Sequence, residues 1–356
     1  MAELRLMKGN EAIAEAAIRA GADGYFGYPI TPQSEVLEYF MAENATERTG
    51  MVVLQAESEV ASIYMVYGAA STGKKIMTSS SSPGISLMQE GLSYLAGAEL
   101  PCLVLNVVRG GPGLGDIQPS QGDYFQSVKG GGHGDYKLIV LAPSSVQEMS
   151  DFVPLAFDLA FKYRNPALIL ADGAIGQMME KVDLFEPIPR KTEITEPWAV
   201  KGKQPGEPKR TITSLDLDPY GMEKHNEHLQ AKYRAMEEND VRYEAIQCDD
   251  AEYIFVAYGV SARICQKAVQ LAREKGIKAG LLRPITLFPF PKKQLAELAD
   301  RVKGFLAVEL SAGQMVEDVR LAVNGKVKVE HFGRMGGIVH SPFEVVAALE
   351  SKIINV

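Results

Sequence analysis

The chain has 356 residues, 46% of them hydrophobic, with 33 glycines, 19 prolines and a formal net charge of −8. This composition is typical of a globular α/β protein with many short loops, and the length predicts two or three compact units. The negative charge and the absence of a basic stripe argue against nucleic-acid binding. The first residues contain no apolar run suited to a signal peptide or a membrane span, so we expect a cytoplasmic protein.

Cysteine and histidine spacing predicts no metal site on this chain. Cys102, Cys248 and Cys265 lie far apart and match neither a zinc knuckle nor an iron–sulfur pattern. His225 and His228 have helical spacing within a charged stretch, which favours a solvated helix face. Any redox cluster should therefore belong to another chain.

The first half of the chain alternates predicted helices with predicted strands. Strands are expected over residues 24–29, 51–55, 75–78, 102–108, 138–141 and 167–170. Helices are expected over residues 9–22, 31–42, 85–96 and 146–163, and from about residue 57. We expect Thr31 to be an N-cap with Pro32 at the first helical position. The alternation predicts a doubly wound parallel sheet whose ligands lie beyond the carboxyl ends of the strands.

Composition divides the chain into three parts. Residues 1–186 form the first predicted domain. Between residues 187 and 250, Pro, Lys, Glu and Thr replace the apolar strands, which predicts a linker with a surface excursion and a charged helix over 225–243. Residues 251–356 form a smaller α/β domain. Its strands are expected over 253–259, 279–282 and 304–308, and its helices over 262–275 and at the end of the chain.

Three polar residues lie where this topology places functional groups. Glu59 begins a helix with almost no polar face, so we expect a buried helix and a partly desolvated carboxylate, suited to sharing a proton with a heterocyclic nitrogen. A simple capping glutamate is an equally good interpretation. Arg109 leaves an apolar strand into a glycine-rich loop, where its fork can hold a carboxylate or clamp loop carbonyls. Thr31 follows another strand, and residues 79–84 form either an anion-binding turn or a polar loop.

Several ordered motifs cover nearly the whole chain. They are Tyr28-Pro29-Ile30-Thr31-Pro32, Glu57-Ser58-Glu59, Ser82-Pro83-Gly84, Arg109-Gly110-Gly111-Pro112, Gln121-Gly122-Asp123, Leu282-Arg283-Pro284 and Glu309-Leu310-Ser311-Ala312-Gly313-Gln314-Met315. With these motifs the chain resembles the alpha subunit of 2-oxoacid:ferredoxin oxidoreductases and, within that family, the 2-ketoisovalerate (3-methyl-2-oxobutanoate) branch.

The resemblance implies thiamine diphosphate bound between subunits. It implies a pyrimidine-type cofactor domain in the first half and a transketolase C-terminal-like domain in the second. Glu59 falls at the position of the cofactor-activating glutamate, with Glu57 as the competitor, and Thr31 and Arg109 fall at those of the substrate-contacting residues. The cofactor-binding residues implied are Tyr28, Pro29, Ile30, Glu59, Ser82 and Gly84. Mg²⁺ and a [4Fe–4S] cluster are expected on partner chains.

The implied reaction is oxidative decarboxylation of a branched-chain 2-oxoacid to an acyl-CoA and CO2, with electrons passed to ferredoxin. The chain is expected to be active only with partners: a beta subunit, a separate gamma subunit and a ferredoxin-like delta subunit. Two alternatives stay open at this point. One is the same chemistry on 2-oxoglutarate, pyruvate or an aryl-pyruvate; the other is a non-catalytic scaffold subunit.

Overall fold

A seven-stranded sheet forms the centre of the computed structural model, which describes residues 3–203 and 205–355. Its strands are β2 (Gly24–Gly27), β3 (Val52–Gln55), β4 (Ile76–Ser80), β5 (Leu103–Val108), β6 (Ile139–Leu141), β7 (Ala167–Asp172) and β12 (Thr286–Phe288). They lie in the order β12-β6-β7-β5-β4-β2-β3, and every pair is parallel except β12–β6. The predicted doubly wound parallel sheet is confirmed.

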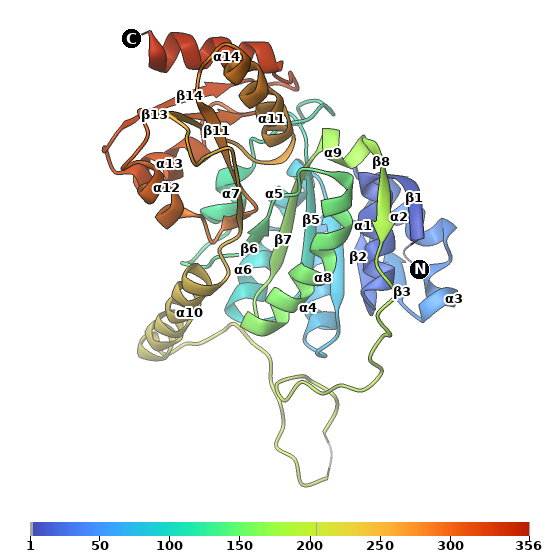
Figure 1. The fold of residues 1–356 in the computed structure, drawn as a ribbon. Coiled ribbons are helices and arrows are strands. Elements are labelled where there is room, and N and C mark those ends of the chain that lie inside the picture. The colour runs from blue at the N-terminus through green and yellow to red at the C-terminus, as the bar shows by residue number, and fades with distance from the viewer. Residues whose placement is uncertain (1–2, 204, 356) are drawn as a thin grey trace.

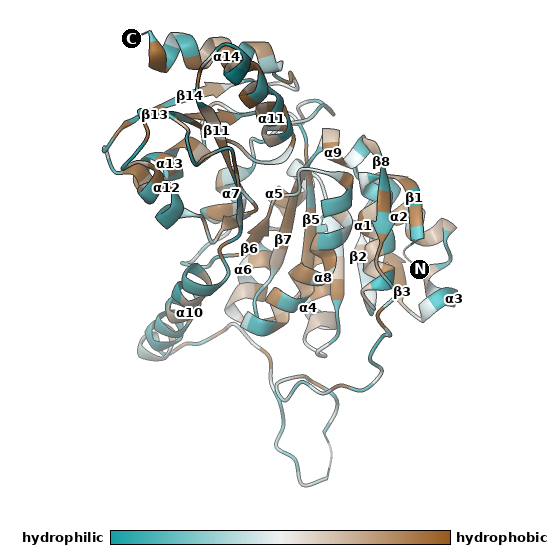
Figure 2. Ribbon diagram, viewed as in Figure 1, coloured by the Kyte–Doolittle hydropathy of each residue, from teal (hydrophilic) through white to brown (hydrophobic). Residues whose placement is uncertain are grey.

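Helices cover this sheet in two layers (Figure 1). One layer contains α1 (Gly9–Arg19), α2 (Ser34–Ala42), α8 (Val146–Tyr163) and α9 (Gly173–Gln177), and the other contains α4 (Glu59–Ala70), α5 (Ser82–Leu87) and α6 (Gln89–Gly97). Two short helices, α3 (Ala45–Thr49) and α7 (Tyr124–Val128), lie in the connections. Because both faces of the sheet are covered, β5 and β7 are buried along their whole length and consist mainly of apolar residues (Figure 2).

The smaller unit is a five-stranded sheet in the order β14-β13-β10-β11-β9. Its strands are β9 (Tyr243–Ile246), β10 (Tyr253–Val256), β11 (Ala279–Pro284), β13 (Gly304–Glu309) and β14 (Lys328–Gly333). Its helices are α11 (Gly259–Glu274), α12 (Lys292–Leu298), α13 (Met315–Val323) and α14 (Pro342–Leu349), with a π-helical turn over Glu350–Ile354.

Strand pairing and a common core cluster join the two units, and the smaller unit also has a core cluster of its own. β12 follows β11 in the chain but pairs with β6 at the edge of the large sheet. β9 precedes the second unit and pairs antiparallel with β11. The main core cluster draws residues from both units, so the units pack as one body.

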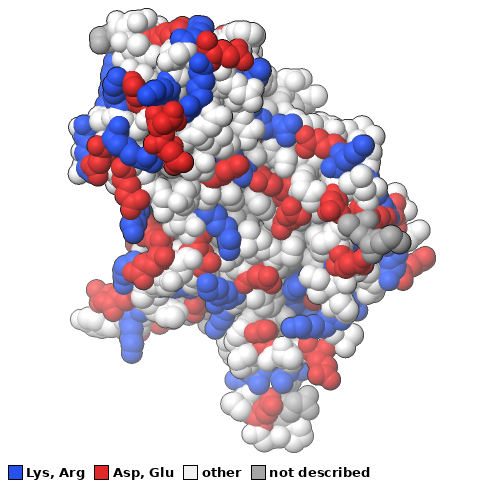
Figure 3. Space-filling model, in the orientation of Figure 1, with Lys and Arg blue, Asp and Glu red and all other residues white. Residues whose placement is uncertain are grey.

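Between β8 (Met179–Leu184) and α10 (Pro219–Asn239), the described residues form no helix or strand. This surface excursion extends below the large sheet in Figure 1. Acidic and basic side chains are interspersed on the face shown in Figure 3, without a basic stripe. No helix in the described ranges is long and apolar enough to cross a membrane.

Several predicted elements have different bounds in the structure. The helix expected over 85–96 is two helices that meet at Met88. The charged helix ends at Asn239, and Tyr243 starts β9 instead of ending the helix. The first helix ends at Arg19 because Gly21 adopts a left-handed conformation. The antiparallel pair of β1 (Glu3–Lys8) and β8 was not predicted, nor were β12, β14 and α13.

Candidate active site

Glu59 is a nearly buried carboxylate at the start of α4. Ser58 caps this helix, accepting a hydrogen bond from the Ala61 N–H at 3.2 Å. The Glu59 side chain is 7% exposed, and within the described part of the chain it forms no hydrogen bond or ion pair. A simple capping role therefore does not account for it.

The sequence predicted that the helix carrying Glu59 is buried on all sides, and this prediction is wrong. Only one side of α4 packs on the sheet, and the opposite side exposes Val60, Tyr64 and Met65. An apolar helix surface that faces solvent in a single chain is typical of a face that packs on another chain.

Gly84 brings the first turn of α5 against Glu59. A Cβ atom added at Gly84 would lie 2.7 Å from Glu59 Oε1 and 2.0 Å from Ser80 Oγ, so only glycine allows this approach. The buried hydroxyls of Ser80 and Ser81 have no partner within the described residues. Ser79, by contrast, is engaged by Tyr25 at 2.6 Å, which gives it a structural role.

Arg109 is 7% exposed and, in the part of the chain that the structure describes, it has no carboxylate partner. Its Nη1 donates to the Thr31 carbonyl at 2.9 Å and its Nη2 to the Leu114 carbonyl at 3.0 Å, while the buried Nε has no acceptor. Arg109 thus clamps loop carbonyls, as one interpretation of the sequence had it, yet it retains an unpaired N–H and an uncompensated charge.

The loop from Tyr28 to Pro32 follows β2 and differs from the prediction. Thr31 and Pro32 occupy a turn closed by the Gln33 N–H donating to the Ile30 carbonyl at 2.9 Å, and α2 starts only at Ser34. Thr31 is therefore no N-cap. Side chains hold its carbonyl and that of Pro32, which accepts from Asn10 Nδ2 at 2.7 Å. The Thr31 side chain is exposed, and the predicted cofactor-contact residues Tyr28, Pro29 and Ile30 are half-buried.

The first turn of α5 joins the Glu59 and Arg109 sides of the site. Ser82 Oγ accepts from the Arg109 N–H at 3.1 Å, and the Ser82 N–H donates to Asn106 Oδ1 at 3.1 Å. Asn106 Nδ2 in turn donates to Asp123 at 2.9 Å. Burial raises the pKa of Asp123, and the hydrogen bonds from Asn106 and Ser82 only partly offset that effect.

Sequence reasoning missed the supporting residues Asn106 and Asp123. Asn106 is the one polar residue of β5, and an amide within an otherwise apolar strand was the available signal. Asp123 belongs to the motif Gln121-Gly122-Asp123, for which the sequence predicted no role.

The arrangement suits a ligand that supplies both an anion and a polar heterocycle. A buried cation and a buried carboxylate that each lack an opposite charge are costly, and a bound group that pairs with each would reduce the cost. The unpaired Ser80 and Ser81 hydroxyls and the close backbone approach at Gly84 add hydrogen-bonding groups between them. These residues fit the aminopyrimidine of thiamine diphosphate at Glu59 and a substrate carboxylate at Arg109.

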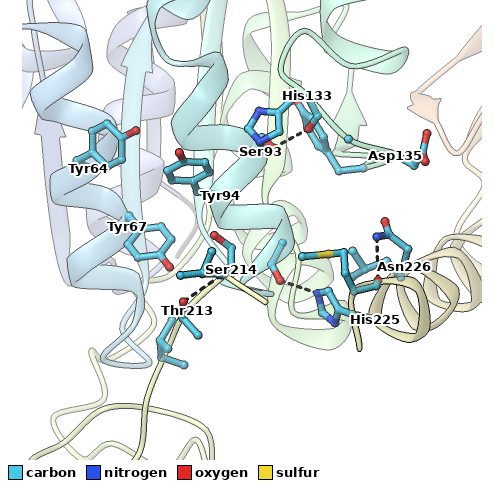
Figure 4. Close-up of a pocket in the computed structure, with 17 residues that line it drawn as sticks. Tyr64, Tyr67, Ser93, Tyr94, His133, Asp135, Thr213, Ser214, His225 and Asn226 are labelled. Atoms are coloured by element: carbon cyan, nitrogen blue, oxygen red, sulfur yellow. Dashed lines mark hydrogen bonds between the residues drawn. The ribbon is translucent and has the colours of Figure 1, made fainter. Parts of the chain in front are cut away.

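A cavity of about 540 Å³ lies elsewhere, between α4, α6, α10 and the surface excursion (Figure 4). Tyr64, Tyr94 and His133 line it, and the two tyrosine hydroxyls donate to Glu90 at 2.8 and 3.1 Å. None of the predicted site residues lines this cavity. His225 Nε2 lies 2.8 Å from the Gly97 carbonyl at its edge, so this histidine packs against α6 and is not fully solvated as expected.

Two family models match the chain. Residues 15–246 match the thiamine diphosphate-binding domain of pyruvate flavodoxin/ferredoxin oxidoreductases, and residues 251–345 match core domain II of pyruvate:ferredoxin oxidoreductase. The chain belongs to the 2-oxoacid:ferredoxin oxidoreductase family.

Individual members of this family are similar over nearly the whole chain. The ketoisovalerate oxidoreductase subunit VorB of Methanothermobacter thermautotrophicus is 53% identical over 94% of this chain and 93% of its own length. The 2-oxoglutarate synthase subunit KorA of Methanocaldococcus jannaschii is 36% identical over 98% of this chain and 99% of its own.

Solved structures agree with this assignment. A 2-oxoglutarate:ferredoxin oxidoreductase from Magnetococcus marinus, with 2-oxoglutarate, coenzyme A and succinyl-CoA bound, superposes with a TM-score of 0.84 at 27% identity. The match covers 98% of this chain and 65% of that chain. A split-gene transketolase, at 13% identity, shares the fold with a TM-score of 0.62 over 97% of both chains.

Proposed function

We propose that this chain is the alpha subunit of a thiamine diphosphate-dependent 2-oxoacid:ferredoxin oxidoreductase that oxidises 2-ketoisovalerate to the acyl-CoA and CO2. One observation carries the proposal. Glu59 and Arg109, both nearly buried and both without an opposite charge in the described residues, lie on either side of the first turn of α5. The similarity at 53% identity to a ketoisovalerate oxidoreductase subunit supports the choice of substrate.

Arg109 and Thr31 bind the substrate carboxylate in this proposal. Each Nη group of Arg109 donates one of its two N–H groups to a loop carbonyl, which leaves one N–H on each Nη to donate to a carboxylate. The contacts to the Thr31 and Leu114 carbonyls hold the guanidinium plane in place. The exposed Thr31 hydroxyl provides a further donor beside it.

Glu59 acts at the other end of the site. Its carboxyl, partly desolvated and placed in the first turn of α4, exchanges a proton with the pyrimidine nitrogen of the cofactor. When bound, thiamine diphosphate supplies the electron sink that a 2-oxoacid needs to lose CO2. Gly84 and the Ser80 hydroxyl lie beside this carboxylate.

Partner chains supply the rest of the reaction in this proposal. We infer a beta subunit that holds the diphosphate, Mg²⁺ and a [4Fe–4S] cluster, with separate gamma and ferredoxin-like delta subunits and ferredoxin as acceptor. The described residues contain no cluster of three or more His, Cys, Asp or Glu side chains suited to a metal. The cytoplasmic location expected from the sequence stays a prediction.

The test is coenzyme A-dependent viologen reduction by the co-expressed complex under anaerobic conditions, across a panel of 2-oxoacids. We expect the highest kcat/KM with 2-ketoisovalerate and its branched relatives. A preference for 2-oxoglutarate or pyruvate would retain the chemistry and overturn the substrate. If a complex with intact clusters and bound cofactor fails to reduce viologen with every 2-oxoacid of the panel, the result would favour the scaffold alternative.

A further inference from the structure

The loop that follows Arg109 presents apolar side chains beside the buried guanidinium. We call residues 110–118 the arginine loop. Its ends are closed by the Gly110 N–H donating to the Gln118 carbonyl at 3.0 Å, and the Asp116 N–H donates to the Gly110 carbonyl at 3.1 Å. At the tip, Leu114 is 83% exposed, and Ile117 is also exposed.

A second loop, residues 335–339, extends this apolar surface from the smaller unit. Gly337 seats it on the arginine loop, since a Cβ added there would lie 2.3 Å from Gln118 Cβ. Met335 and Ile338 are exposed in this loop. Two loops from different units therefore meet, and each exposes apolar side chains.

Leu114 contacts the cation directly through its backbone. Its carbonyl accepts from Arg109 Nη2 at 3.0 Å, just as the Thr31 carbonyl accepts from Nη1 at 2.9 Å. Leu114 and Thr31 thus flank the guanidinium through their backbones, and each exposes its side chain.

The two loops carry no cation of their own for a second anionic group, and Arg334, which precedes the second loop, pairs with Glu344. The loops contain no Lys or Arg, and their one charged residue is Asp116, whose Oδ1 accepts from the Gln118 N–H at 2.8 Å. Apart from Arg109 itself, the loops offer nothing to pair with a second carboxylate, and Asp116 repels one.

We propose that Leu114 is a specificity-determining residue, which contacts the alkyl group of the substrate and selects branched apolar 2-oxoacids over dicarboxylic ones. This inference rests on the proposed function. In a 2-oxoacid, one carbonyl carbon separates the carboxylate from the first alkyl carbon. A carboxylate held by Arg109 therefore leaves the alkyl group within reach of the residue beside the guanidinium, and burying it against Leu114 removes apolar surface of both from water.

The experiment compares substrate preference in the co-expressed complex carrying Leu114→Ala or Leu114→Arg. We expect Leu114→Ala to lower the kcat/KM ratio of 2-ketoisovalerate to pyruvate by about tenfold, because apolar contacts discriminate by roughly this factor. Leu114→Arg supplies a cation for a second carboxylate, so we expect the ratio of 2-oxoglutarate to 2-ketoisovalerate to rise by about tenfold or more. Leu217→Ala, on the surface excursion and 87% exposed, is the matched control and should leave all ratios unchanged.

A binding measurement separates specificity from general damage. Calorimetry on the same complexes with the unreactive analogue 3-methylbutanoate should show about tenfold weaker binding for Leu114→Ala, while the Kd for coenzyme A stays the same. Variants that lower kcat/KM equally for all substrates, or that keep the wild-type ratios, would overturn the inference and leave the proposed function standing. A wild-type complex that turns over no 2-oxoacid would overturn both.

Discussion

At the scale of single residues, the burial of Glu59 and that of Arg109 each cost free energy in the isolated chain, for different reasons. A carboxylate in the first turn of a helix gains from the helix dipole, but burial takes away its water. Two of the three nitrogens of the Arg109 guanidinium donate to carbonyls, which accept hydrogen bonds without neutralising the charge. Each residue therefore gains more from a bound ligand than from its surroundings in this chain.

Replacing Glu59 by Gln tests the proton role. The change keeps the shape of the side chain and removes the exchangeable proton, so we expect viologen reduction to fall at least about 100-fold, the usual scale of general acid–base catalysis. Size-exclusion chromatography should show unchanged assembly. Glu57→Gln is the control, because Glu57 is exposed and its hydrogen bond among the described residues is to its neighbour Ser58. Near wild-type turnover in Glu59→Gln would remove Glu59 from the mechanism.

Position along the chain was enough to predict the charged residues but not their supports. Glu59 and Arg109 follow strands, and the carboxyl ends of parallel strands meet at one edge of the sheet, so their convergence was predictable. The turn at Thr31 was not, because its carbonyls are held by Asn10 and Arg109 from distant parts of the sequence. A local capping rule contains no information about such long-range donors.

At the scale of elements, the buried central strands were predictable from the sequence, and the short edge strands that pair with distant segments were not. β5 and β7 form continuous apolar runs, which a doubly covered sheet requires. β12 has three residues and pairs across the boundary between the units, and β1 alternates exposed and half-buried residues against β8. Their formation depends on partners far along the chain, which local periodicity does not reveal.

A nearly buried ion pair joins an element of each unit. Arg283, at the end of β11 and 2% exposed, donates to both carboxylate oxygens of Glu148 on α8, at 2.6 and 2.7 Å. Burial pushes the pKa of Glu148 up, but the Arg283 hydrogen bonds and charge outweigh burial and hold it below the ordinary value. A depressed carboxyl pKa contributes stability above the unfolded-state value, and this contribution is lost as pH falls through the folded-state value.

Glu148→Gln should therefore destabilise the protein at neutral pH. Among the described residues, Glu244, about half exposed, is then the one ion-pair partner left to the buried Arg283 charge. We expect a loss of about 2–3 kcal/mol, below the range for a fully buried pair because Glu148 is partly exposed. Scanning calorimetry should show the wild type losing its advantage over the variant as the pH falls below the ordinary pKa of a glutamate carboxyl.

The matched control for this pair is Glu237→Gln, which breaks an exposed bridge to Lys292. Exposed bridges are worth about 0–1 kcal/mol, so this variant should differ little from the wild type at any pH. Equal destabilisation by Glu148→Gln and Glu237→Gln would mean that the Arg283 pair does not hold the units together.

At the scale of the whole molecule, the outer face of α4 is the surface that a single chain does not explain. Beyond Glu59 this helix has no charged residue, and Val60, Tyr64 and Met65 are exposed. The same helix carries the carboxylate proposed to reach a cofactor that a second chain also holds. A partner that binds to this face would both cover the apolar side chains and exclude water from Glu59.

Met65→Lys is the corresponding prediction for assembly. A lysine on this face should remain solvated in the isolated chain, so its fold and its calorimetric transition should match the wild type. In the complex it would be buried without a partner, and we expect co-purification of the beta subunit to fall by about tenfold or more. Leu321→Lys, on the exposed side of α13 in the smaller unit, is the control and should co-purify normally. A Met65→Lys complex of wild-type yield alongside a failing Leu321→Lys complex would move the interface from α4 to the smaller unit.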